Sequence, residues 1–191
     1  MIEKNDVRPA WDDKGICVFR KDGYDKIITG SPRSIYKRTM VVFIILLCGI
    51  IATALMTVFM NICAVGSRRN LYTIKILTQM LATLNAKVPS VDAGSFRFVA
   101  VAVHYAIGVL FALVYYMLRT SNGYIGFTSP AEPWIIGFIY GMTGVSGWIV
   151  FIRIHPSPPQ TVPWQLYLCC IFLGHLVFTF TMIFSFALLL R

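Results

Sequence analysis

Long apolar stretches alternate with short polar segments along most of the chain. Four stretches contain no Asp, Glu, Lys or Arg: residues 40–65, 98–118, 133–152 and 162–190. Each has the ~20 apolar residues that a helix needs to cross the hydrocarbon core of a bilayer. Away from water a segment must satisfy its backbone hydrogen bonds internally, and four segments cannot close a barrel. The pattern therefore predicts an all-α membrane protein whose four transmembrane helices form a bundle.

A shorter periodic segment lies between the first and second spans. Ile74, Leu77, Leu81 and Leu84 recur at helical spacing, with polar side chains between them. Such a stripe is typical of an amphipathic helix that buries one face. We expect a short interfacial helix here, on the membrane surface or over one end of the bundle.

The polar start of the chain sets the domain organisation. Residues 1–39 form a basic tail, and residues 40–191 form the transmembrane domain. Within the tail, two short strand-like runs flank Lys21-Asp22-Gly23, which predicts a β-hairpin over residues 15–28. We expect no cleavable signal peptide in the tail, and its Lys and Arg residues favour a cytoplasmic N-terminus. With four spans, the C-terminus would be cytoplasmic as well.

Composition and charge support the membrane interpretation. Hydrophobic residues make up 57% of the chain and charged residues only 13%, about half the charged share of a soluble domain. The net charge of +9 comes from Lys and Arg in the tail, the loops and the span ends, where cations meet lipid headgroups. No RNA-binding signature or zinc-finger spacing is present. The bilayer is therefore the expected partner, and nucleic acid is not.

Small residues on two spans indicate where helices approach closely. They are Gly108 and Ala112 in the second span and Gly137, Gly141 and Gly144 in the third. Helices in lipid associate through close packing, which small side chains permit. We favour packing within one bundle over a dimer interface.

Three histidines are the candidate binding residues. His104 and His175 lie inside the second and fourth spans, and His155 follows the third. The order of the spans places all three in the same half of the membrane. Neutral imidazoles that bridge helices by hydrogen bonds are the favoured interpretation. A shared site for a lipid, another small ligand, a metal or a haem is the alternative, because buried ionisable residues are costly in lipid.

Little in the sequence supports catalysis. The spans contain no buried acid or base besides histidine, and no carboxylate pair is available for general acid–base chemistry. We therefore expect a non-catalytic accessory or scaffold subunit of a larger membrane complex, with other membrane subunits as partners. The alternatives are a ligand-binding module at His104 and His175, and a small transporter.

Several short motifs are similar to those of a known group of proteins. In order they are GIIATALMTVFM (49–60), ILTQML (76–81), HYAIGVLFALVY (104–115), GFIYG (137–141) and GHLVF (174–178). This order, over roughly residues 45–185, resembles small bacterial four-helix inner-membrane proteins of uncharacterised function. The resemblance implies a multi-pass protein of the bacterial inner membrane, and it implies no activity.

Overall fold

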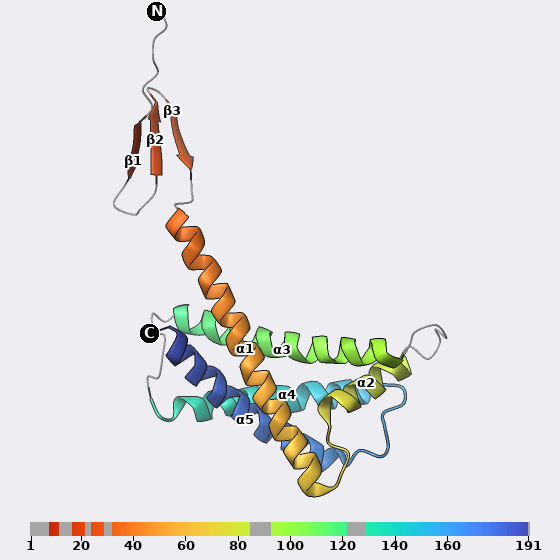
Figure 1. Ribbon diagram of the computed structural model, residues 1–191. Coiled ribbons are helices and arrows are strands. Elements are labelled where there is room, and N and C mark those ends of the chain that lie inside the picture. Colours follow the sequence, from red (N-terminus) through yellow and green to blue (C-terminus); the bar gives the residue numbers. More distant parts are fainter. Residues whose placement is uncertain are drawn as a thin grey trace, which may run out of the picture. The chain divides into compact units, whose positions relative to one another are not determined.

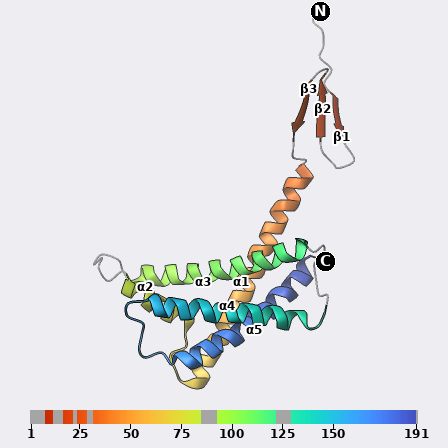
Figure 2. The ribbon, with the colours of Figure 1, turned by 180° about the vertical axis from the view of Figure 1, so that it is seen from behind.

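The structure of this chain is a computed structural model in two compact units, Met1–Phe43 and Ile44–Arg191. It describes residues 8–11, 17–21, 24–28, 32–84, 93–121 and 129–190. Figure 1 shows both units, and Figure 2 shows them from behind. Charge and hydropathy predict a boundary at residue 39, and the first unit ends at Phe43.

The first unit contains a small antiparallel sheet. Its strands are β1 (Arg8–Trp11), β2 (Cys17–Lys21) and β3 (Tyr24–Ile28), in the order β1-β2-β3 (Figure 1). In the β2–β3 pair Cys17 lies opposite Ile28 and Lys21 opposite Tyr24, within the segment where the sequence predicts a hairpin. The strand β1, which pairs with β2, is an addition that the sequence analysis did not predict. The turn between β2 and β3 lies outside the described residues.

The second unit is helical, and its architecture confirms the predicted fold class. The long helices are α1 (Pro32–Ser67, which begins in the first unit), α3 (Ala93–Ser121), α4 (Glu132–Ile154) and α5 (Trp164–Leu189). The shorter α2 (Thr73–Leu84) lies between the first and second of these in the chain. All four long helices are long and apolar enough to span a bilayer. The chain is therefore a multi-pass membrane protein.

The outward surface of the long helices is apolar, as lipid contact requires. Large side chains such as Ile62, Phe98, Leu110 and Ile139 are more than half exposed on their helices. Contiguous apolar surface of this extent is rare on soluble monomers. Burial of this surface in the bilayer removes the cost of exposing it to water.

Helix α5 supplies much of the core, and α4 packs against it through glycines. A Cβ added to Gly137 would come within 2.7 Å of Leu176 Cδ2, and one added to Gly141 within 2.7 Å of Phe172 Cδ2. Only residues without a side chain allow the two backbones to come this close. These two predicted packing glycines therefore lie at a contact within one chain.

Small residues also bring α1 and α3 together. A Cβ added to Gly49 would lie 2.7 Å from Val109 Cα, and one added to Gly108 would overlap the Thr53 hydroxyl. Ala112, one turn further along α3, is completely buried. The predicted small residues of the second span thus lie at another contact between helices of the same bundle.

The α4–α5 connection holds α2 in place through His155. The buried His155 ring donates from Nε2 to the Met80 carbonyl on α2, at 2.9 Å, and its Nδ1 accepts from the Ser157 N–H at 3.2 Å. The carbonyl can only accept and the backbone N–H can only donate, so the tautomer is set. Of the expected stripe only Leu77 is buried; the other buried residues of α2 are Thr73, Ile76 and Met80.

The His155→Ala substitution should loosen α2. We expect a loss of about 1–2 kcal/mol of stability, because the Met80 carbonyl and the Ser157 N–H both lose their partner. Hydrogen–deuterium exchange across residues 73–84 should become faster. Thr83→Ala is the matched control, since this exposed hydroxyl bonds only to the Gln79 carbonyl of its own helix. Unchanged exchange in His155→Ala would show that α2 does not depend on this side chain.

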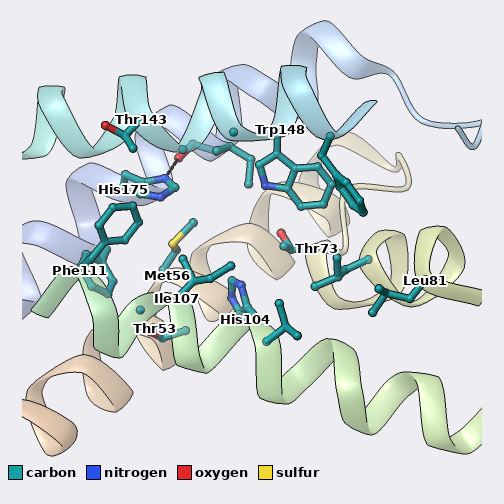
Figure 3. A pocket seen from close by; sticks show the side chains of 18 residues that line it. Thr53, Met56, Thr73, Leu81, His104, Ile107, Phe111, Thr143, Trp148 and His175 are labelled. Atoms are coloured by element: carbon teal, nitrogen blue, oxygen red, sulfur yellow. Dashed lines mark hydrogen bonds between the residues drawn. The ribbon is translucent and has the colours of Figure 1, made fainter. Parts of the chain in front are cut away.

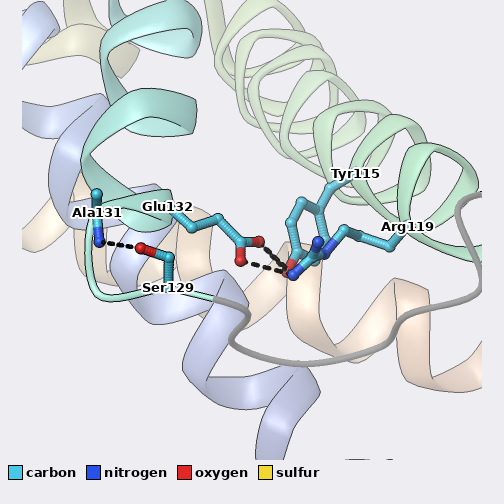
Figure 4. A network of polar contacts seen from close by, with 5 residues as sticks. All are labelled: Tyr115, Arg119, Ser129, Ala131 and Glu132. Atoms are coloured by element: carbon cyan, nitrogen blue, oxygen red, sulfur yellow. Dashed lines mark hydrogen bonds and ion pairs between the residues drawn. The ribbon is translucent and has the colours of Figure 1, made fainter.

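An ion pair joins the end of α3 to the start of α4. Arg119 Nη2 lies 2.6 Å from both carboxylate oxygens of Glu132, and the Tyr115 hydroxyl lies 3.4 Å from Oε1 (Figure 4). The Arg119 and Glu132 side chains are only 14% and 10% exposed. The cation lies in the last turn of one helix and the anion in the first turn of the next, so each complements a helix dipole.

Candidate functional site

A pocket of about 480 Å³ lies inside the helical unit. All five helices contribute to its wall, so the pocket forms only when the whole bundle is assembled. Figure 3 shows His104 on α3 and His175 on α5 pointing into it from different sides. Its lining residues are Thr53, Met56, Thr73, Leu77, Leu81, Val103, His104, Ile107, Gly108, Phe111, Thr143, Gly144, Gly147, Trp148, Phe151, Ile171, His175 and Phe178.

His175 is held in one orientation by α5 and α4. Its Nδ1 lies 2.8 Å from the Ile171 carbonyl, four residues earlier on the same helix. A carbonyl oxygen only accepts, so Nδ1 carries the proton and the neutral ring presents a lone pair at Nε2. Gly144 of α4 makes room for this ring: a Cβ there would lie 2.6 Å from Nε2 and overlap Cε1. Phe111 meets the ring edge-to-face at 5.8 Å between centroids.

His104 is fixed by a chain of two hydrogen bonds to α1. The Thr57 hydroxyl donates to the Thr53 carbonyl at 2.8 Å, which uses its only proton. His104 Nε2, 3.1 Å from the same hydroxyl, must therefore be the donor in that contact. In the neutral ring the remaining nitrogen, Nδ1, is then an acceptor. Each of the two histidines thus has one committed N–H and one nitrogen with a lone pair.

The rest of the wall offers little polar chemistry. No Asp, Glu, Lys or Arg is among the lining residues. The Thr53 and Thr143 hydroxyls both donate to carbonyls of their own helices, at 2.7 and 2.8 Å. The Trp148 indole N–H and the Thr73 hydroxyl, which is buried without a hydrogen-bond partner, also belong to lining residues. The pocket is therefore a mostly apolar volume whose nitrogen acceptors are the two imidazoles.

The pocket reaches the lipid-facing surface along α3 and α4. Val103 and Ile107 line it and are also 38% and 48% exposed. On α4, Thr143 and Gly147 line it and are exposed too. A Cβ added to Gly147 would meet nothing within 4 Å. In a bilayer these positions contact acyl chains, so a lipophilic molecule could enter sideways from the membrane.

The three histidines do not form one site. His104 and His175 line the same pocket, whereas His155 is engaged with Met80 and Ser157 and lines no part of it. Across the described ranges, no group of three or more His, Cys, Asp or Glu side chains is placed to hold a metal ion. His104 bridges α3 to α1 through Thr57, the arrangement that the sequence analysis favours, whereas His175 bonds to a carbonyl of its own helix.

The sequence analysis missed the apolar part of the wall. Trp148, Phe151 and Leu77 line the pocket, but apolar side chains in a membrane span do not reveal from the sequence which face they occupy. The one signal available is Gly144 with Gly147, one turn apart on α4. One of these glycines accommodates the His175 ring, and the other leaves space open.

Comparisons with known proteins do not add a family to this description. No family model, curated protein or solved structure matches the chain.

Proposed function

We propose that this chain is a membrane-embedded binding protein for a lipophilic small molecule. The observation that carries the proposal is the pocket itself, because it joins an apolar volume of about 480 Å³ to two oriented imidazoles. Small-molecule sites are typically concave, mostly apolar and supplied with a few placed polar groups. The exposed edge along α3 and α4 supports entry from the bilayer.

The cellular setting of this function is also a proposal. The resemblance of the motifs supports the inner membrane of a bacterium, and the basic residues near the first span support cytoplasmic termini. A role as an accessory or scaffold subunit stays a prediction, since the described residues identify no protein partner. Transport stays a prediction as well.

Saturable binding of an apolar probe tests the proposal. We expect the purified protein in mild detergent to bind 1-aminoanthracene, a lipophilic fluorophore small enough for the pocket, above the background of the detergent alone. Gly147→Phe should weaken this binding at least tenfold, because the added ring extends into open space at the edge of the pocket. Thermal unfolding should show that the variant is folded.

Val150→Phe is the matched control. Val150 lies three residues further along α4, is 57% exposed, and does not line the pocket. The same bulk added there should leave the affinity for the probe unchanged. Binding that is absent in the wild type, or that both variants weaken equally, would refute the proposed function.

A further inference from the structure

We propose that the pocket selects a neutral lipophilic molecule that donates hydrogen bonds through hydroxyl groups, the class to which quinols belong. This inference rests on the proposed function and adds the chemistry of the ligand. It follows from the protonation pattern of the two imidazoles. His175 presents Nε2 and His104 presents Nδ1, and both are acceptors in the neutral rings.

The tautomers resist change because each is tied to the backbone. Moving the His175 proton to Nε2 would set the lone pair of Nδ1 against the Ile171 carbonyl. Moving the His104 proton to Nδ1 would require the Thr57 hydroxyl to leave the Thr53 carbonyl and donate to the ring instead. Each change sacrifices a hydrogen bond away from water, where unpaired groups are costly. Each of the two lining imidazoles therefore keeps one nitrogen as an acceptor.

Two acceptors discriminate between molecules of the same shape. A quinol places O–H donors where the corresponding quinone places carbonyl oxygens, which only accept. A site built to hydrogen-bond a substrate hydroxyl rejects an analogue without it, because the buried partner remains unpaired. The quinol should therefore bind more tightly than the quinone, although the two rings differ by only two hydrogens.

The remaining wall favours a neutral ring. Phe111, Trp148, Phe151 and Phe178 supply aromatic surface for stacking. No lining side chain carries a charge, so a fatty acid or the propionates of a haem would have no counter-ion there. Bis-histidine ligation of a haem would also use His104 through Nδ1, since Nε2 is bonded to Thr57. An uncharged hydroxyl compound fits these groups better.

Competition against bound 1-aminoanthracene tests the inference with matched probes. Decyl-quinol, kept reduced under anaerobic conditions, should displace the fluorophore at a concentration at least tenfold below that of the decyl-quinone. The dimethyl ether of the quinol, which has the same skeleton and no donor, should behave like the quinone. The amount of displaced fluorophore is the quantity compared, so the different optical properties of the competitors do not enter the comparison.

Two variants link the preference to the imidazoles. His175→Phe keeps a ring beside Gly144 but removes the lone pair, so it should weaken the quinol at least fivefold and the quinone little. Thr57→Val keeps the shape of the side chain but frees the proton of His104, so the preference for the quinol should fall severalfold. Thr57 does not line the pocket, which makes this change a test of tautomer control.

The possible outcomes test the inference and the proposed function separately. If the fluorophore binds but quinol and quinone compete equally, or neither competes, the pocket stands and the proposed ligand class is wrong. If the preference survives in both variants, the imidazoles do not cause it, and the inference is overturned. If the fluorophore itself does not bind, the proposed function fails first.

Discussion

Gly144→Ala should destabilise the helical unit by about 1–3 kcal/mol, the usual cost of overpacking a tight contact. The new methyl group would overlap the His175 ring, whose Nε2 would lie 2.6 Å from it. The ring cannot move away without losing the Ile171 bond. Alanine also improves helix propensity by about 1 kcal/mol over glycine, which offsets part of the loss. Unfolding in detergent with a mild denaturant measures the net change.

Gly147→Ala is the matched control, since it makes the same substitution one turn away. Its methyl group would meet nothing within 4 Å, so stability should stay constant or rise. Gly144→Ala combined with His175→Ala should recover stability relative to the two single changes, because the ring that clashes is gone. Equal losses at Gly144 and Gly147 would mean that helix geometry, rather than the contact with His175, explains the effect.

Removing either partner of the Arg119–Glu132 pair should also destabilise the protein strongly. Arg119→Met leaves the Glu132 carboxylate largely buried without the cation at 2.6 Å. Breaking a buried pair in this way costs about 3–5 kcal/mol. The melting temperature in detergent should fall accordingly. The separation of α3 and α4, followed by a pair of spin labels at their joined ends, should increase.

The double change Arg119→Met with Glu132→Gln provides the control. It removes both charges, so much of the loss in Arg119→Met should be regained. Glu132→Gln alone should also be damaging, because it leaves the guanidinium without its carboxylate. If the three variants lose stability additively, the pair does not act as a unit.

The fold could be predicted because it depends on properties that are local in the chain. The length and hydropathy of the four apolar stretches predict the helices α1, α3, α4 and α5, and bilayer thickness leaves no other conformation open to them. Helix α2 follows from apolar spacing in the same way.

Pairings between distant segments could not be predicted. The predicted stripe of α2 is Ile74, Leu77, Leu81 and Leu84, of which only Leu77 is buried. The buried face also includes Thr73 and Met80, which lie outside the stripe. Position on the bundle decides burial here, and helical spacing alone does not. Strand β1 shows the same limit. It pairs with β2, and its own sequence carries no signal that specifies this pairing.

The candidate site could be predicted from the sequence only in part. His104 and His175 are conspicuous in the sequence as ionisable side chains inside apolar spans. The assignment of their free nitrogens depends on Thr57 and on the Ile171 carbonyl, which only the assembled bundle reveals. His155 looks equivalent in the sequence, yet it serves to hold α2.

Photoaffinity labelling tests most directly whether the pocket takes up a lipophilic molecule from the bilayer. A decyl alcohol carrying a diazirine would be activated in vesicles containing the protein, and the labelled residues mapped by mass spectrometry. We predict labels on buried pocket residues such as Met56 and Leu77, which an excess of decyl-quinol suppresses. Labels confined to outward side chains such as Leu110 and Ile139, unaffected by that competitor, would contradict the account.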